Sequence, residues 1–225
     1  MSLLPVPDGL IFDLDGTLWD TCASCAAAWN RALARRGFRF RKISVEDVRG
    51  VTGLPHADCI RAVFTGLPEQ QIAALIQDTM EEDNRVVARL GGVLYPGVEE
   101  GLPRLAQRYP LFIVSNCQAG YIEAFLNWTG WSAMFHDFEC WGNTGQPKAV
   151  NTARVMERNG LSAPLFIGDT EGDSRAARSC GLRFAHVGYG FGRCDDFDLA
   201  VESFPELVSR MLEGNIRQDA ERLSP

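Results

Sequence analysis

The chain has 225 residues, 46% of them hydrophobic and 23% charged, which suits a globular protein with a sizeable core. Its net charge of −7 argues against nucleic acid or an anionic membrane as the main partner, because both favour basic surfaces. The opening MSLLPVPDG lacks the features of a signal peptide, and no apolar run is long enough to span a membrane. Seven scattered cysteines suit a reducing compartment, so we expect a cytoplasmic protein.

The first segment with chemical interest is GLIFDLDGTLWDT, which starts at Gly9. Its apolar residues predict a strand buried on both faces, with Asp13 and Asp15 at its far end. Residues two apart on a strand point to one side, so both carboxyl groups should emerge together and need a compensating cation or hydrogen bonds. A bound metal ion is one interpretation of this pair, and a loop or helix cap is the other.

A helical block with no convincing strand is predicted from about Asp20 to Leu90. The Ala-rich stretch Cys22–Arg36 predicts a helix with Gly37 as its C-cap, and Ser44 with Asp47 resembles the N-cap of a short helix. Further helices of the block are predicted at residues 56–64 and 68–90.

Strands and helices alternate in the rest of the chain. The predicted strands lie at 111–115, near 135–140, at 164–169 and at 184–190, and the predicted helices at about 96–108, 119–126, 148–160 and 205–212, with a further helix directly after the strand at 164–169. Such alternation indicates a parallel sheet with helices on both faces. The predicted fold class is therefore α/β, with a Rossmann-like core formed by residues 1–19 and 91–225 and an inserted α-helical domain at 20–90.

Polar residues gather at the carboxyl ends of the predicted strands, where ligands bind in open α/β sheets. Asp13 and Asp15 end the first strand, Ser115 the second and Asp169 the fourth. Polar residues at the ends of three strands on the same rim predict a functional site there.

Ser115 and Asn116 follow the second strand directly and precede a predicted helix. A hydroxyl, an amide and free backbone N–H groups at a helix N-terminus form an anion pocket that suits phosphate. Ser115 with Gln118 also satisfies a capping box, so helix capping remains an alternative explanation.

Lys148 occupies the first turn of a helix that begins at Pro147, beside the positive end of the helix dipole. This position costs about 0.3–1 kcal/mol relative to an acidic residue. A cation that neutralises a bound phosphate and an attacking carboxylate would explain the placement.

Asp169 and Asp173 lie at the start of the helix after the fourth strand, where they can face Asp13 across the rim. With the backbone carbonyl of Asp15, these residues form a set of hard oxygen ligands. Such a set favours Mg²⁺ over zinc, which prefers His or Cys.

These residues together resemble the motifs of the haloacid dehalogenase-like hydrolase superfamily, and the resemblance covers nearly the whole chain. The matches, in family order, are DLDGTL from Asp13 to Leu18, Ser115-Asn116, Lys148 and GDTEGD from Gly168 to Asp173. The helical block resembles the cap domain that one branch of the superfamily inserts after the first motif.

The resemblance implies that Asp13 is the nucleophile that becomes an aspartyl phosphate, and that Asp15 is the general acid and base. It assigns Mg²⁺ to Asp13, the Asp15 carbonyl and Asp169, with Asp173 as support for the metal site.

The resemblance also assigns the phosphoryl oxygens to Thr17, Ser115, Asn116 and Lys148. The segment RGVTGLP, which starts at Arg49, resembles the cap loop that reaches the active site. Arg49 is therefore either a contact to the substrate leaving group or a solvated arginine beside a turn.

The function implied is a Mg²⁺-dependent phosphatase that hydrolyses a small phosphorylated metabolite, similar to phosphoglycolate phosphatase. Asp15 argues against the dehalogenase and phosphonatase branches, which lack this second aspartate. Sugar phosphomutases carry a cap histidine where Cys25 lies here, so a mutase remains an alternative, as does a non-catalytic binding protein. The expected partner is a small phosphate ester, without nucleic acid or membrane, and the expected state is a monomer or homodimer.

Overall fold

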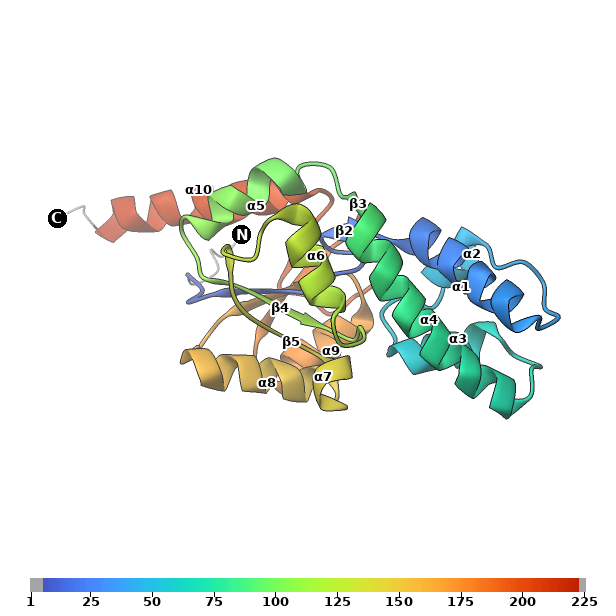
Figure 1. Cartoon of the computed structure of the whole chain (residues 1–225). Coiled ribbons are helices and arrows are strands. Elements are labelled where there is room, and N and C mark those ends of the chain that lie inside the picture. The colour runs from blue at the N-terminus through green and yellow to red at the C-terminus, as the bar shows by residue number, and fades with distance from the viewer. Residues whose placement is uncertain (1–5, 223–225) are drawn as a thin grey trace.

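The sheet has six parallel strands in the order β5-β4-β1-β6-β7-β8 (Figure 1). The computed structural model describes residues 6–222. The strands are β1 (Leu10–Phe12), β4 (Leu111–Ser115), β5 (Phe135–Cys140), β6 (Leu165–Gly168), β7 (Arg183–Val187) and β8 (Leu199–Val201). This topology confirms the predicted Rossmann-like α/β fold class.

Helices cover both faces of the sheet, with α5 and α10 above it and α8 below it in Figure 1. The helices of this core are α5 (Val98–Ala106), α6 (Tyr121–Thr129), α7 (Trp141–Thr144), α8 (Lys148–Asn159), α9 (Glu171–Ser179) and α10 (Phe204–Arg222). Leu10 and Phe12 are fully buried in a cluster with α5, α6 and α10, whereas Ile11 is fully buried with α8 and α9. Because strand residues alternate between faces, a sheet covered on both sides requires an unbroken apolar run.

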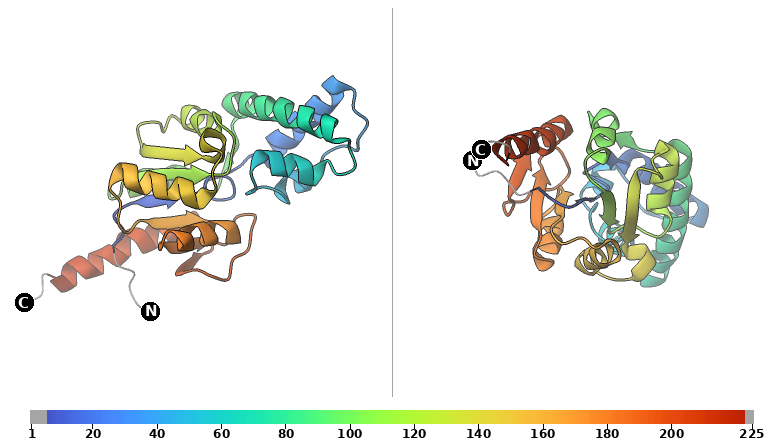
Figure 2. Two further views of the ribbon diagram at one scale, coloured as in Figure 1. Left: turned by 90° about the horizontal axis from the view of Figure 1, so that it is seen from below. Right: turned by 90° about the vertical axis from the view of Figure 1, so that its left-hand side faces the viewer.

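The segment between β1 and β4 forms four helices around a hydrophobic cluster of its own. These helices are α1 (Cys22–Arg36), α2 (Val45–Arg49), α3 (His56–Val63) and α4 (Glu69–Leu90). The predictions for two helix ends are confirmed: Gly37 adopts a left-handed φ of 65°, and Ser44 and Asp47 form a capping box. The left view of Figure 2 shows this helical block beyond one end of the sheet, with α10 extending away from it.

Several short elements were not predicted. Strands β2 (Trp19–Asp20) and β3 (Val93–Leu94) pair antiparallel where the chain enters and leaves the helical block. Two-residue strands are too short to show the period of two on which strand prediction depends. Strand β8, with three residues, and helix α7, with four, are also too short for their periodicity to be recognised, and α10 is longer than its predicted range.

Two local predictions about the sheet rim were wrong. Strand β1 ends at Phe12, so Asp13 and Asp15 lie in the turn after it and strand alternation does not align their side chains. Helix α6 begins at Tyr121 after a left-handed Gly120, so Ser115 is not its N-cap. The alternative explanation by a capping box is therefore overturned, and the Gln118 side chain donates a hydrogen bond to Asn84 of the helical block.

Candidate active site

Three neighbouring strands bring the predicted residues to one rim of the sheet. Strand β1 pairs with β4 on one side and with β6 on the other. Asp13 follows β1, Ser115 ends β4 and Asp169 follows β6. The chain builds outward from β1 in both directions, which makes this rim the topological switch point where open α/β sheets bind ligands.

Asp13, Lys148 and Asp173 form a buried ion-pair group. Lys148 Nζ donates hydrogen bonds to Asp13 Oδ1 at 2.8 Å and to Asp173 Oδ1 at 2.6 Å. Burial opposes the lysine charge, but the two carboxylates outweigh it and raise the pKa of Lys148. Burial also raises the pKa of Asp13 well above its usual range, and the lysine charge works against that rise. The two ion pairs of Lys148 therefore offset the cost of its position in the first turn of the helix.

The Asp169 carboxylate is held by backbone groups on one oxygen and left open on the other. Its Oδ2 accepts hydrogen bonds from the amides of Phe191 at 2.8 Å and Gly192 at 3.1 Å. Its Oδ1 is buried without a hydrogen-bond partner among the residues that the structure describes. Gly16, with a φ of 89°, permits this approach, since a Cβ there would lie 2.4 Å from Asp169 Oδ2.

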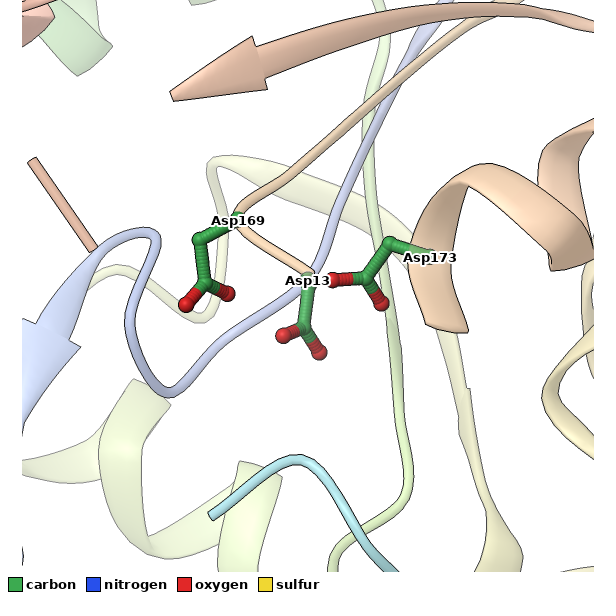
Figure 3. A group of neighbouring side chains, drawn as sticks. All are labelled: Asp13, Asp169 and Asp173. Carbon is green, nitrogen blue, oxygen red and sulfur yellow. The ribbon is translucent and has the colours of Figure 1, made fainter. Parts of the chain in front are cut away.

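The side chains of Asp13, Asp169 and Asp173 lie next to one another (Figure 3). One oxygen from each of these buried carboxylates lies within 4.8 Å of the others. Lys148 supplies a single positive charge to this group, and close carboxylates cannot all stay ionised without further compensation. The donor atoms are hard oxygens, and Asp169 keeps one unpaired, so the residues present fit Mg²⁺.

Asp15 is held by two hydroxyl groups that sequence reasoning did not identify. Its Oδ1 accepts hydrogen bonds from Thr21 Oγ1 at 3.0 Å and from Tyr121 OH at 2.9 Å. Burial raises the pKa of Asp15 to about 6, although both hydroxyls work in the opposite direction. A carboxyl group with such a pKa can both give and take a proton near neutral pH.

A cavity of about 70 Å³ lies between the rim and the helical block. Asp13, Asp15 and Ser115 line its core side, and the segment from Val51 to Leu54 lines its opposite side. The remaining lining residues come from α1 and the residue before it, from α2, α3 and α4, and from the segment around α6, namely Thr21, Cys25, Trp29, Val48, His56, Cys59, Asp83, Asn116, Cys117, Gln118 and Tyr121. Asn116 also donates a hydrogen bond to the carbonyl of Gly53 at 2.8 Å, so the two sides of the cavity are in direct contact.

A model of the haloacid dehalogenase-like hydrolase family matches residues 10–187, which span all the carboxylates at the rim. The chain belongs to this family. Among its relatives, the phosphoglycolate phosphatase of Rhodobacter capsulatus is 30% identical over 81% of this chain and 84% of its own length. The phosphoglycolate phosphatase of Psychrobacter arcticus is 25% identical over 91% of this chain and 95% of its own length.

Solved structures show the same fold at lower identity. A haloacid dehalogenase-like family protein from Streptococcus pneumoniae has 20% identity and a TM-score of 0.77, over 91% of this chain and 97% of its own. The protein CbbY from Rhodobacter sphaeroides, solved with phosphate, has 20% identity and a TM-score of 0.73, over 90% of this chain and 96% of its own. Its family and its relatives together show that the chain is a phosphatase, that is, a phosphoric monoester hydrolase.

Five predicted site residues of this hydrolase are absent from the cavity lining: Lys148, Asp169 and Asp173, which belong to the charged group around Asp13, and Thr17 and Arg49. Thr17 is fully buried, and its hydroxyl has no hydrogen-bond partner in the part of the chain that the structure describes. The Arg49 guanidinium binds Asp20 at 3.0 Å and lies 5.8 Å from the ring centre of Phe191. The predicted contacts of Thr17 and Arg49 to a substrate therefore stay predictions. No described helix of this protein is long and apolar enough to cross a membrane.

Proposed function

We propose that this phosphatase hydrolyses a small phosphorylated metabolite, in a Mg²⁺-dependent reaction that passes through an aspartyl phosphate on Asp13. The observation that carries the proposal is the pairing of Asp13, which lines the cavity, with Lys148 beside Asp169. A carboxylate held by a cation in this way can act as a nucleophile toward phosphorus. The family relationship and the phosphatase names of the relatives support the same chemistry.

The Mg²⁺ ion would be held by Asp13, the backbone carbonyl of Asp15 and Asp169. When bound, the ion supplies positive charge that offsets the repulsion between the carboxylate nucleophile and the phosphate. Asp173 accepts hydrogen bonds on both carboxylate oxygens, from Lys148 and from Thr170, so its role is to support this site.

Asp15 would transfer the protons of the reaction. It first protonates the leaving oxygen as the Asp13 carboxylate attacks phosphorus, and then takes a proton from the water that hydrolyses the aspartyl phosphate. Tyr121 and Thr21 fix the carboxyl group that performs both steps. Lys148, Ser115 and Asn116, with Thr17 in the turn, would stabilise the oxygens of the transferring phosphoryl group.

The helical block at residues 20–90 would act as a cap that closes over the bound ester. Its contacts with the core support this role, because they connect segments at the cavity rim. Asn116 donates to Gly53, and Asn84 donates to the carbonyl of Ala119 at 2.7 Å. A closed cap excludes bulk water from the reacting groups and selects the leaving group.

The test is phosphate release from a panel of small phosphate esters, with and without Mg²⁺, by wild type and Asp13→Asn. We expect turnover that needs Mg²⁺ and that falls by about 10,000-fold in the variant, since the nucleophile is removed. Turnover retained by folded Asp13→Asn would overturn the proposed nucleophile. Phosphoryl transfer between sugar hydroxyls without net release would favour the phosphomutase alternative.

A further inference from the structure

The cavity has two chemically different ends. At its core end (Asp13, Asp15, Ser115), the cation Lys148 lies next to the nucleophile. At its cap end (Trp29, His56, Asp83), the lining includes a carboxyl group, and no lysine or arginine of the described chain lines the cavity. The phosphate end is thus provided with positive charge, while the end that faces the leaving group is not.

The lining residue Asp83 has a carboxyl oxygen without a hydrogen-bond partner among the described residues. It lies on α4 with 2% of its surface exposed, and its Oδ2 accepts a hydrogen bond from Trp29 Nε1 at 2.9 Å. Its Oδ1 is buried and has no hydrogen-bond partner among the described residues, although the thiol of Cys25, a weak donor, lies beside the carboxyl group. A buried acceptor without a partner is costly, so a ligand that supplies a hydrogen bond there is favoured.

His56 does not supply positive charge to this end. Its Nε2 forms a hydrogen bond with Thr79 Oγ1 at 2.9 Å, and its Nδ1 lies 3.7 Å from Asp83 Oδ2. Burial lowers the pKa of His56 to about 4, so the ring is neutral at physiological pH. Burial also raises the pKa of Asp83 to about 8, so a ligand that donates a hydrogen bond or carries a positive charge is needed to stabilise its ionised form near neutral pH.

We propose that Asp83 is a specificity-determining residue, which accepts a hydrogen bond from a hydroxyl or ammonium group on a short leaving group. This inference rests on the proposed phosphatase function and narrows its substrate class. The volume of about 70 Å³ sets the size, because a single water molecule needs about 10–15 Å³ on the same measure. The space suits a leaving group of a few non-hydrogen atoms.

A carboxylate leaving group would fit this end poorly for a physical reason. It would lose part of its hydration in the cavity and find no cation in the lining to replace that hydration. Phosphoglycolate carries such a carboxylate, so the names of the relatives do not transfer simply to this chain.

The test compares four two-carbon phosphate esters that differ at the far carbon: ethyl phosphate, 2-hydroxyethyl phosphate, phosphoethanolamine and phosphoglycolate. For the wild type, we expect kcat/KM for the hydroxyl or ammonium ester to exceed that for phosphoglycolate by at least about tenfold. The ester of these two that has the higher kcat/KM shows whether a hydroxyl or an ammonium group donates the hydrogen bond to Asp83. Ethyl phosphate, which has no polar group at that carbon, gives the baseline.

The variant Asp83→Asn keeps the size of the side chain and an acceptor for Trp29, but it adds N–H donors at the cap end. We expect it to lose the preference for the hydroxyl or ammonium ester and to gain activity on phosphoglycolate relative to ethyl phosphate. The matched control is Asp78→Asn, because Asp78 is a buried carboxylate of the same helix that pairs with Arg36 outside the cavity lining. It should keep the wild-type ranking.

Two results would overturn the inference: a wild-type preference for phosphoglycolate, or an unchanged ranking in folded Asp83→Asn. Both leave the phosphatase proposal intact, provided that the esters are hydrolysed with Mg²⁺ and require Asp13. Failure of the proposed function has a different signature, namely no Mg²⁺-dependent release from any of the four esters or from the wider panel. Thermal unfolding of each variant separates loss of selectivity from loss of folding.

Discussion

The core end and the cap end of the cavity each contain a buried carboxyl group, but only the one at the core end has a cationic partner. Asp13 receives a hydrogen bond from Lys148, and this cation works against the rise in pKa that burial causes. Asp83 receives a hydrogen bond from the neutral indole of Trp29, and its pKa rises to about 8. A partner cation keeps a buried carboxylate available as a nucleophile, whereas a neutral partner leaves a carboxyl group suited to recognition.

The division has a topological basis. The core end is built from turns after adjacent parallel strands, which fix the positions of Asp13 and Asp169 through the sheet itself. The cap end is built from side chains on α1, α3 and α4, which pack around their own hydrophobic cluster. Changes at the cap end can therefore alter the choice of leaving group without moving the reacting groups.

The largest effect is expected for Lys148→Met, which removes the cation of the core end and keeps a similar length of side chain. Asp13 and Asp173 then lose their shared donor, and the transferring phosphoryl group loses a positive charge. We expect kcat to fall by about 100- to 1,000-fold for every ester, measured as phosphate release at saturating Mg²⁺.

The matched control for this prediction is Lys42→Met, at the other lysine of the chain, which is exposed. It should leave kcat close to wild type. A selective loss in Lys148→Met, confined to one type of leaving group, would contradict the assignment of Lys148 to the phosphoryl end.

A second prediction concerns Asp169→Asn, which removes a proposed Mg²⁺ ligand and one buried carboxylate from the group. The metal-free protein should become more stable, because like charges at short range destabilise the fold. Its affinity for Mg²⁺ should fall by at least about 10- to 100-fold. Thermal unfolding with and without Mg²⁺ measures both effects, since a ligand that binds the native state raises its stability.

Glu171→Gln serves as the control for Asp169→Asn, since the Glu171 side chain is exposed and pairs with Arg175. Its response to Mg²⁺ should match wild type. An unchanged Mg²⁺ response in Asp169→Asn would place the metal elsewhere.

A third, smaller effect is expected for Tyr121→Phe, which removes one donor from Asp15. That hydrogen bond favours the ionised carboxylate, so its loss should raise the pKa of Asp15 above about 6. Because Asp15 is protonated when it releases the leaving group in the proposed mechanism, the fall of kcat/KM with rising pH should move to higher pH. A charged hydrogen bond of this kind corresponds to a displacement of about one pH unit.

Tyr189→Phe is the control for this pH profile, because the Tyr189 hydroxyl donates to the carbonyl of Thr17 and not to Asp15. Its profile of kcat/KM against pH should match that of the wild type. Equal displacement in both tyrosine variants would show that packing, and not the hydrogen bond to Asp15, sets the profile.

The smallest effect is expected for Arg49→Gln, which breaks a partly exposed ion pair with Asp20. Such a pair is worth about 0–1 kcal/mol, so kcat/KM should change by less than about fivefold for each ester. A larger loss for one ester class alone, measured on the same four-ester series, would instead support the predicted contact of Arg49 with the leaving group.

Much of the core could be predicted because local patterns and the sheet rule act together there. The helix at Cys22–Arg36 and the strand at Leu111–Ser115 were predicted with their observed bounds, from an Ala-rich run with a C-cap glycine and from an apolar β-branched run. The rule that ligands bind at the carboxyl ends of strands then placed Asp13, Ser115 and Asp169 together.

The rest depends on contacts between distant parts of the chain. The hydrogen bond from Tyr121 to Asp15 spans 106 positions, and no local pattern marks either residue as a partner of the other. Asp83 lies in the charged run EEDNR, where a sequence indicates a solvated helix face, yet packing of α4 against α1 buries it beside Trp29. Burial of a charged residue is decided by tertiary packing, which sequence periodicity does not reveal.

The central claim, that Asp13 accepts the phosphoryl group, is tested most directly by ¹⁹F NMR with beryllofluoride, which mimics an acyl phosphate on a carboxylate. We predict protein-bound ¹⁹F signals for the wild type in the presence of Mg²⁺, and their loss without Mg²⁺ or in Asp13→Asn. Signals of equal intensity in folded Asp13→Asn would contradict the account and assign the nucleophile to another residue.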